Sequence, residues 1–178
     1  MSTLRSDAVR SRARILEVAR THSRADLRLN EVAREAGVGV GTVYRHFPTV
    51  GALIEAISAT TISQMLVISR QARDEPDAAT ALSFYLRSAL ALQLEDDGLQ
   101  TVLLSPADEA EEVRAAKREI FETFSGLLDT AKAAGAVRAD LTVMQVAHLV
   151  CGIEYAVRLG SLSDREGFLD ILLGGLRP

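Results

Sequence analysis

Residues 30–49 read NEVAREAGVGVGTVYRHFPT, which predicts two short helices joined by a tight turn. Asn30 is a suitable N-cap for the first helix, and Gly37 can adopt the positive φ that ends it. The second helix covers residues 40–46. Pro48 ends it, because the residue before a proline is pushed out of the helical region. This stretch therefore predicts a helix-turn-helix.

The second of these helices concentrates side chains that can donate hydrogen bonds to DNA. The major groove of DNA is wide enough to admit such a helix. We expect Tyr44 and His46 to bind phosphates and Arg45 to lie near the base edges. The full set of residues expected at the DNA is Asn30, Val40, Gly41, Thr42, Tyr44, Arg45, His46 and Thr49.

The pattern A-x-x-A-G-V-x-x-G-T-V-Y-x-H-F over residues 33–47 resembles the signature of the TetR family of bacterial transcriptional regulators. The detailed similarity runs over residues 12–57. The resemblance implies an all-α fold that dimerises through its last two helices, and most such proteins are repressors released by a small molecule. The chain departs from the family at Val50, where a phosphate-contacting Lys is usual, and in the shortened segment 21–29.

Two other interpretations of the glycine-containing turn are possible. An ordinary helix hairpin would explain the helices, but not the extended similarity or the charge distribution. Gly37, Gly39 and Gly41 do not have the G-x-G-x-x-G spacing of a phosphate-binding loop, and no strand precedes them.

Charge is divided unevenly along the chain. Residues 1–47 hold nine arginines and five acidic residues, a net charge of +4. The whole chain has a net charge of −4, so residues 48–178 carry −8. This distribution is expected of a DNA-binding module fused to another domain. The arginines near the N-terminus are further candidates for phosphate contacts: Arg5, Arg10, Arg12 and Arg14.

The composition favours a cytoplasmic protein. The N-terminus, MSTLRSDAVRSR, is polar and lacks the apolar segment of a secretory signal, and no apolar run approaches the length of a membrane span. The single cysteine, Cys151, cannot form an intrachain disulfide and fits a reducing compartment. A small core residue is its simplest interpretation, with a redox-sensing thiol as the alternative.

Helical periodicity continues to the C-terminus, so we expect an all-α protein of about nine helices. The predicted domains are a DNA-binding domain at 1–48 and a ligand-binding and dimerisation domain at 49–178, connected by a long helix at 49–73. Local signals predict where three later helices begin: Ser105-Pro106, the capping-box pair Thr142 and Gln145, and a second such pair, Ser163 and Glu166.

The helix after Thr142 is apolar nearly all round, which indicates burial on more than one side. One side can face the protein core, and the other needs a second subunit. The leucine-rich last helix shares that role. We therefore expect a homodimer whose interface includes Val146, Val150, Ile153, Val157, Leu172 and Leu176.

A small apolar or amphipathic effector is expected to bind among aromatic and methionine side chains of the C-terminal helices. The predicted lining is Met65, Phe84, Phe121, Phe124 and Tyr155, and a packed core is the alternative interpretation of the same residues. The three histidines have no partner at metal-ligand spacing, so we expect no metal site. No catalytic constellation or cofactor motif is present in the sequence, which argues against an enzyme.

The sequence as a whole predicts a DNA-binding transcriptional regulator that resembles the TetR family. It would bind a palindromic operator as a dimer, with its two DNA-binding domains, or heads, about 34 Å apart. The rival interpretation is a helical ligand-binding or adaptor protein of the same architecture that has lost DNA binding, an idea that Val50 supports.

Overall fold

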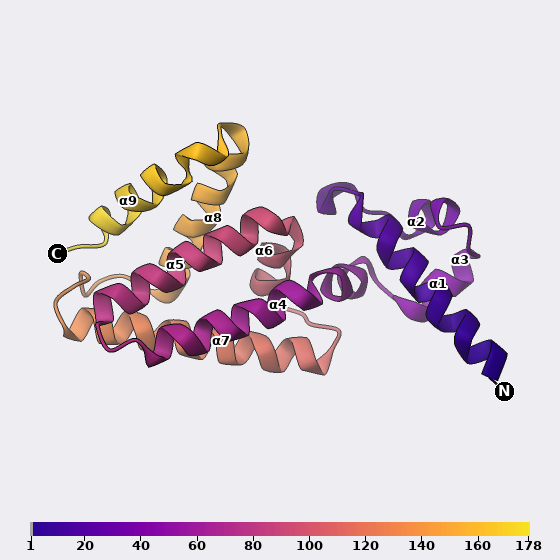
Figure 1. The fold of residues 1–178 in the computed structure, drawn as a ribbon, viewed down its shortest axis with the longest axis horizontal. Coiled ribbons are helices and arrows are strands. Elements are labelled where there is room, and N and C mark those ends of the chain that lie inside the picture. Colours follow the sequence, from indigo (N-terminus) through magenta and orange to yellow (C-terminus); the bar gives the residue numbers. More distant parts are fainter. Residues whose placement is uncertain (1) are drawn as a thin grey trace. The chain divides into compact units, whose positions relative to one another are not determined.

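The computed structural model describes residues 2–178, with side chains from Ser6 onward. Within these residues the fold is all-α, with two short 3-10 helices and no strand (Figure 1). The predicted fold class and the number of helices are confirmed. The α-helices are α1 (Ser2–Arg20), α2 (Leu29–Glu35), α3 (Val40–His46), α4 (Val50–Asp74), α5 (Ala78–Glu95), α6 (Asp97–Leu104), α7 (Glu111–Ala133), α8 (Val143–Leu159) and α9 (Arg165–Gly175).

The helix-turn-helix forms as predicted, with one correction at its start. α3 has the predicted bounds, and Gly37 takes a φ of 61° in the turn before it. Asn30, however, is not the N-cap of α2. Arg28 holds that position in an extended conformation, and Asn30 lies inside the first turn. The helix starts two residues earlier than predicted, at Leu29, whose side chain is buried.

The predicted starts of two later helices are wrong. The sequence Ser105-Pro106 does not open α7, which begins only at Glu111. The Ser105 hydroxyl instead bonds to the backbone N–H and carbonyl of Ala107 in a local turn. α9 begins at Arg165 with Asp164, not Ser163, at the N-cap and without a side-chain cap, and Glu166 forms an ion pair with Arg87.

The capping box at the start of α8 is confirmed. The Thr142 hydroxyl accepts from the Gln145 N–H at 3.2 Å, and the Gln145 side chain accepts from the Thr142 N–H at 2.8 Å. α8 ends at Gly160, as predicted.

The chain divides into two compact units. The first comprises the residues up to Thr60 together with Asp97–Arg114, and the second comprises Thr61–Asp96 with Ala115–Pro178. α4 and α7 each continue from one unit into the other. The domain boundary predicted after residue 48 stays a prediction.

Buried apolar side chains hold the second unit together. α8 packs along α5 and α9. The Tyr85 and Phe124 rings stack with their centroids 4.8 Å apart. The Arg158 side chain forms an ion pair with Glu154 one turn earlier and donates to the Gln93 carbonyl at 2.8 Å. It thereby satisfies a carbonyl at the C-terminal end of α5 that has no partner within the helix.

The expectation that no apolar run approaches the length of a membrane span does not hold for α4. The helix is long and apolar enough to cross a membrane by length and composition, with a mean hydropathy of 1.5 over its most apolar window. Three polar side chains, Glu55, Ser58 and Ser69, are nevertheless buried along it. Core helices of soluble proteins also meet the length and composition criteria, so this single helix is weak evidence for a membrane segment.

Candidate functional site

The turn before α3 requires glycine and sets the direction of that helix. Gly37 has a φ of 61°, a backbone conformation that residues with a Cβ atom rarely adopt. Val43 and Phe47 anchor the other side of α3 because both side chains are almost fully buried. α3 also contacts α1 and α2. The short helix is therefore held in one orientation by its core-facing residues.

The opposite side of α3 is open to solvent. One face of the helix carries four exposed residues: Val40, Gly41, Tyr44 and Arg45. They share this face because Tyr44 follows Val40, and Arg45 follows Gly41, by four residues, which is about one helical turn. The Arg45 guanidinium donates to the Thr42 hydroxyl at 3.0 Å, which extends the side chain along the helix surface. These residues are placed to read a groove, and their contact with DNA stays a prediction.

The remaining predicted DNA contacts lie elsewhere in the first unit. His46 is half-buried, with its ring 6.2 Å from that of Phe47, and Asn30 is exposed on α2. Thr49 caps α4: its hydroxyl oxygen accepts from the Ala52 N–H at 3.0 Å. Val50, in place of the family's usual Lys, is half-buried at the first position of α4.

The arginines of α1 are partly engaged within the chain. Arg12 lies over the Phe47 ring at 5.3 Å from its centroid, a cation–π contact that links α1 to the end of α3. Arg10 forms an ion pair with Asp7. The side chain of Arg5 lies outside the described residues.

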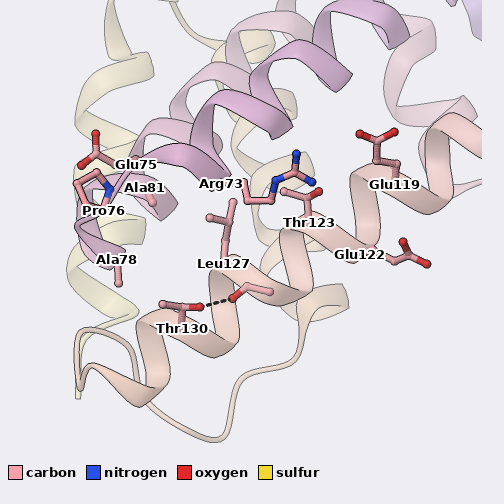
Figure 2. A pocket seen from close by; sticks show the side chains of 11 residues that line it. Arg73, Glu75, Pro76, Ala78, Ala81, Glu119, Glu122, Thr123, Leu127 and Thr130 are labelled. Atoms are coloured by element: carbon pink, nitrogen blue, oxygen red, sulfur yellow. Dashed lines mark hydrogen bonds between the residues drawn. The ribbon is translucent and has the colours of Figure 1, made fainter.

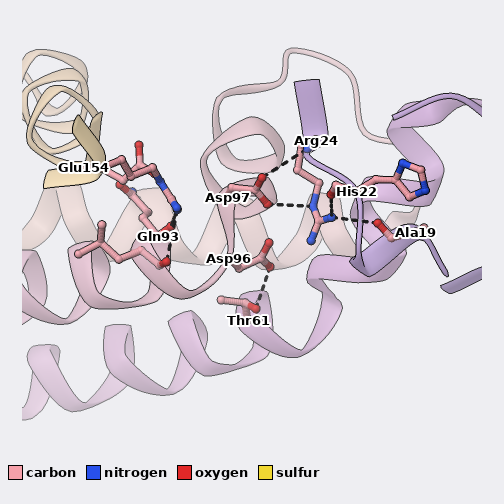
Figure 3. Close-up of polar contacts among 10 residues, drawn as sticks. Ala19, His22, Arg24, Thr61, Gln93, Asp96, Asp97 and Glu154 are labelled. Atoms are coloured by element: carbon pink, nitrogen blue, oxygen red, sulfur yellow. Dashed lines mark hydrogen bonds and ion pairs between the residues drawn. The ribbon is translucent and has the colours of Figure 1, made fainter. Parts of the chain in front are cut away.

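Sequence reasoning missed Arg24, which connects the helix-turn-helix to α6 (Figure 3). Its side chain donates to the carbonyls of Ala19 and His22 near the end of α1, at 3.2 and 3.0 Å. Its Nε atom lies 3.1 Å from a carboxylate oxygen of Asp97, the first residue of α6. The two residues are 73 positions apart, so no local pattern could have found this ion pair.

The predicted interface residues on α8 and α9 lie mostly inside the single chain. Five of the six are buried within the single chain, namely Val146, Val150, Val157, Leu172 and Leu176, and Ile153 is half-buried. These side chains face the protein's own core. A different set of large apolar side chains is exposed on and after α8: Met144, Leu149, Tyr155, Leu159, Leu162 and Ile171.

The five residues predicted to line the effector cavity differ in their burial. Met65 and Phe124 are buried, Phe121 is half-buried, and Phe84 and Tyr155 are exposed. Because Phe84 and Tyr155 face outward, the five side chains do not line one cavity. They are divided between the core, where Phe124 stacks on Tyr85, and the surface.

A cavity of about 360 Å³ lies instead between the end of α4, the start of α5 and α7 (Figure 2). Apolar side chains such as Ala81 and Leu127 line part of it, and Arg73, Glu119 and Glu122 lie at its polar side. Such a combination suits a molecule with one apolar and one polar end.

Comparison with known proteins decides the family. The model of bacterial regulatory proteins of the tetR family matches residues 15–57. A second model, the C-terminal domain of SbtR-like transcriptional regulators, matches residues 77–178, more than half of the chain. The chain belongs to the TetR family. It is therefore a DNA-binding transcriptional regulator, and TetR regulators bind DNA as dimers and are generally non-enzymatic.

Solved structures of TetR regulators share this fold. A TetR regulator from Streptomyces coelicolor is 30% identical, with 96% of this chain and 98% of that one covered and a TM-score of 0.55. FadR from Bacillus subtilis, solved in complex with stearoyl-CoA, is 17% identical, with 95% and 99% covered and a TM-score of 0.57. The FadR of Bacillus halodurans, a fatty acid degradation regulator, is 17% identical, with 96% of each chain covered and a TM-score of 0.59. A comparison with curated protein sequences found no match.

Two substitutions on α3 of this TetR regulator should have different consequences. Arg45→Ala should cost about 1–3 kcal/mol of binding free energy and relax sequence preference at one position of each half-site, if Arg45 reads a guanine. Tyr44→Phe should weaken binding to all sequences alike, because it would remove the predicted phosphate contact. Titration of both variants against a panel of single-base operator variants checks this. Equal losses for Arg45→Ala on every sequence would assign Arg45 to the phosphates.

The thiol of Cys151 should be unreactive in the folded protein. Burial and then the nearby Glu154 carboxylate raise the pKa of this thiol to about 11, so the reactive thiolate is scarce at neutral pH. Alkylation by iodoacetamide at pH 8 should be far slower in the native protein than in urea, and it should speed up as the pH approaches 11. Rapid native labelling would favour the redox-sensing alternative.

Proposed function

We propose that this TetR regulator is a repressor that binds a palindromic operator and leaves it when a small molecule binds the C-terminal helices. The observation that carries the DNA-binding part is the exposed face of α3, where Tyr44 and Arg45 project from a helix anchored by buried Val43 and Phe47. Phosphate contacts would supply affinity, and Arg45 would supply sequence preference. A cytoplasmic location, where the DNA of a bacterium lies, is part of the proposal.

Dimerisation is proposed through the outward side of α8 and α9, which together present the exposed apolar side chains. Tyr155 is 63% exposed, Leu159 72% and Ile171 73%, although each is apolar over most of its surface. Exposed apolar groups in this density mark protein interfaces. Two heads brought about 34 Å apart by such a dimer could enter successive major grooves on one side of the duplex.

The effector is proposed to be amphipathic and to occupy the cavity in Figure 2. The apolar side chains there would take a hydrocarbon portion, and Arg73 would face an acidic group. FadR of Bacillus subtilis, which shares the fold, was solved with stearoyl-CoA, a molecule of this kind. A ligand that prefers one arrangement of the helices would shift the dimer away from the spacing that fits the operator.

The rival function is a ligand-binding adaptor of the same fold that has lost DNA binding. Val50 favours it, because the side chain at the start of α4 cannot make the usual phosphate contact. Selection of bound fragments from a random DNA pool, followed by titration against bulk DNA, separates the two. A palindromic consensus bound at least about a thousand-fold more tightly than bulk DNA supports the regulator. No preference for any sequence would leave the adaptor.

Ligand release is tested on the selected operator with stearoyl-CoA as the first probe and coenzyme A as its control. Release by stearoyl-CoA but not by coenzyme A would show that the hydrocarbon portion drives the response. The variant Ala78→Arg, which places a charge at a half-buried wall of the cavity, should abolish release while operator binding persists. Release that is unaffected by this change would place the effector elsewhere.

A further inference from the structure

A buried carboxylate in α4 holds the start of α7. Glu55 is only 6% exposed, although carboxylates are seldom buried without strong partners. One of its oxygens accepts from the Glu109 N–H at 2.8 Å, and the other accepts from the Ala110 N–H at 3.0 Å. These two N–H groups belong to the turn immediately before α7 (Glu111–Ala133).

The negative charge of Glu55 suits this place for two reasons. The first N–H groups of a helix and of the turn that enters it have no partner within the helix, and the positive end of the helix dipole attracts an anion. Hydrogen bonds to an ionised acceptor are also about twice as strong as neutral ones. Glu55 therefore satisfies N–H groups in the turn that enters α7, whereas the predicted capping residue, Ser105, forms a local turn with Ala107.

A second contact joins the same two segments. The Thr49 hydroxyl donates to a carboxylate oxygen of Glu109 at 2.9 Å while its oxygen caps α4. Thr49 and Glu55 thus attach the first two turns of α4 to the turn before α7. We name this pair of contacts the α4–α7 clasp, formed by Glu55 and Thr49 with Glu109 and Ala110.

The clasp lies next to the DNA-reading helix. α3 ends at His46, and α4 begins at Val50, so only a short link separates the two helices. A cavity of about 410 Å³ borders the clasp and is lined by residues from the end of α3, the start of α4 and the start of α7. The hydrogen bonds of the clasp therefore lie at the edge of this cavity, and they add to the packing of the buried apolar side chains at the start of α4, among them Leu53 and Ile54.

We propose that Glu55 is a positioning residue for operator binding: through the clasp it fixes the start of α4, and with it α3, to α7. Because α7 continues into the second unit, the clasp would relay the dimer's geometry to the heads and so determine which half-site spacing fits. This inference rests on the proposed binding of a dimer to a palindromic operator. Glu55 itself need not touch DNA.

The test uses the full-length protein and three DNA duplexes: the selected operator, the operator with one base pair inserted between the half-sites, and a single half-site. Wild type should lose about 100-fold in affinity on the insertion, because one head is displaced and rotated relative to its groove. Glu55→Gln, which can no longer accept from both N–H groups, should bind the operator about 10-fold more weakly. Its loss on the insertion should shrink to less than about 10-fold.

Two further variants separate positioning from simple damage. Glu109→Ala removes the second contact and leaves both Glu55 and the Thr49 cap of α4 in place, so it should relax the spacing requirement in the same direction even if Glu55→Gln folds poorly. Glu112→Gln removes an exposed charge from the first turn of α7 and should behave as wild type. Affinity for the single half-site should be unchanged by Glu55→Gln, since the head itself is intact.

The remaining outcomes contradict either the proposed role of Glu55 or the proposed function on which it rests. If Glu55→Gln weakens the half-site and the operator equally, the residue only supports the fold of the head and the inference is overturned. An undiminished insertion penalty in both Glu55→Gln and Glu109→Ala would overturn it as well. If the wild-type protein shows no operator preference, the proposed function is wrong. This failure differs from a failure of the inference, because it is seen in the wild type without any variant.

Discussion

Replacing Leu159 with aspartate is expected to yield folded monomers that no longer bind the operator tightly. Leu159 is 72% exposed on α8, so the single chain loses little by the change. In the dimer the same carboxylate would be buried against apolar side chains without a partner, which costs several kcal/mol. A monomer carries one head, so its affinity for a two-half-site operator should fall by about 100-fold or more. Sedimentation velocity and operator titration measure both effects.

The matched control for Leu159→Asp is Val67→Asp. Val67 is 52% exposed but lies on α4, away from α8 and α9 in the sequence, and it is not part of the proposed interface. This variant should remain dimeric and bind the operator as wild type does. A dimeric Leu159→Asp protein with normal affinity would show that the outward side of α8 does not mediate assembly.

Replacing Val157 with aspartate should unfold the protein instead of separating the dimer. Val157 is only 2% exposed within the single chain, although it is two residues from Leu159 on the same helix. An unpaired charge in the core costs about 3–5 kcal/mol or more, a large part of the 5–15 kcal/mol that stabilises a typical domain. Circular dichroism melts should show a much lower Tm or no cooperative transition.

Val157→Ile is the corresponding control, because it keeps an apolar side chain at the site. It should cost about 1–3 kcal/mol through overpacking and leave the dimer intact. A folded, monomeric Val157→Asp protein would instead place Val157 at the interface, as the sequence alone had suggested. The pair Val157 and Leu159 therefore distinguishes the two sides of α8.

Several features could be read from the sequence because their causes are local. The helix-turn-helix depends on a glycine with positive φ at Gly37 and on a proline at Pro48, and both act within a few residues of their own position. The start of α8 depends on the reciprocal bonds of Thr142 and Gln145, which are three residues apart. Periodicity and the signature over residues 33–47 then indicated the fold class and the family.

The tertiary structure decided what periodicity leaves open. A helix that is apolar nearly all round, such as α8, must be covered on two sides, but its sequence does not say which side meets the protein's own core. Packing against α5 and α9 buried Val157 and left Leu159 exposed, and for this reason we propose the outward side of α8 as the interface. The scattered aromatic side chains were likewise divided between core and surface by packing.

The start of α7 shows most directly the difference between what the local sequence determines and what the tertiary structure determines. Locally, Ser105-Pro106 followed by acidic residues is a strong signal for a helix start, and the sequence by itself determined only that a helix begins in this region. The helix begins at Glu111, and the N–H groups of Glu109 and Ala110 in the turn that enters it are satisfied by a carboxylate more than 50 positions earlier, that of Glu55. A cap supplied from another helix leaves no local pattern in the sequence, and only folding brings its two partners within hydrogen-bonding distance.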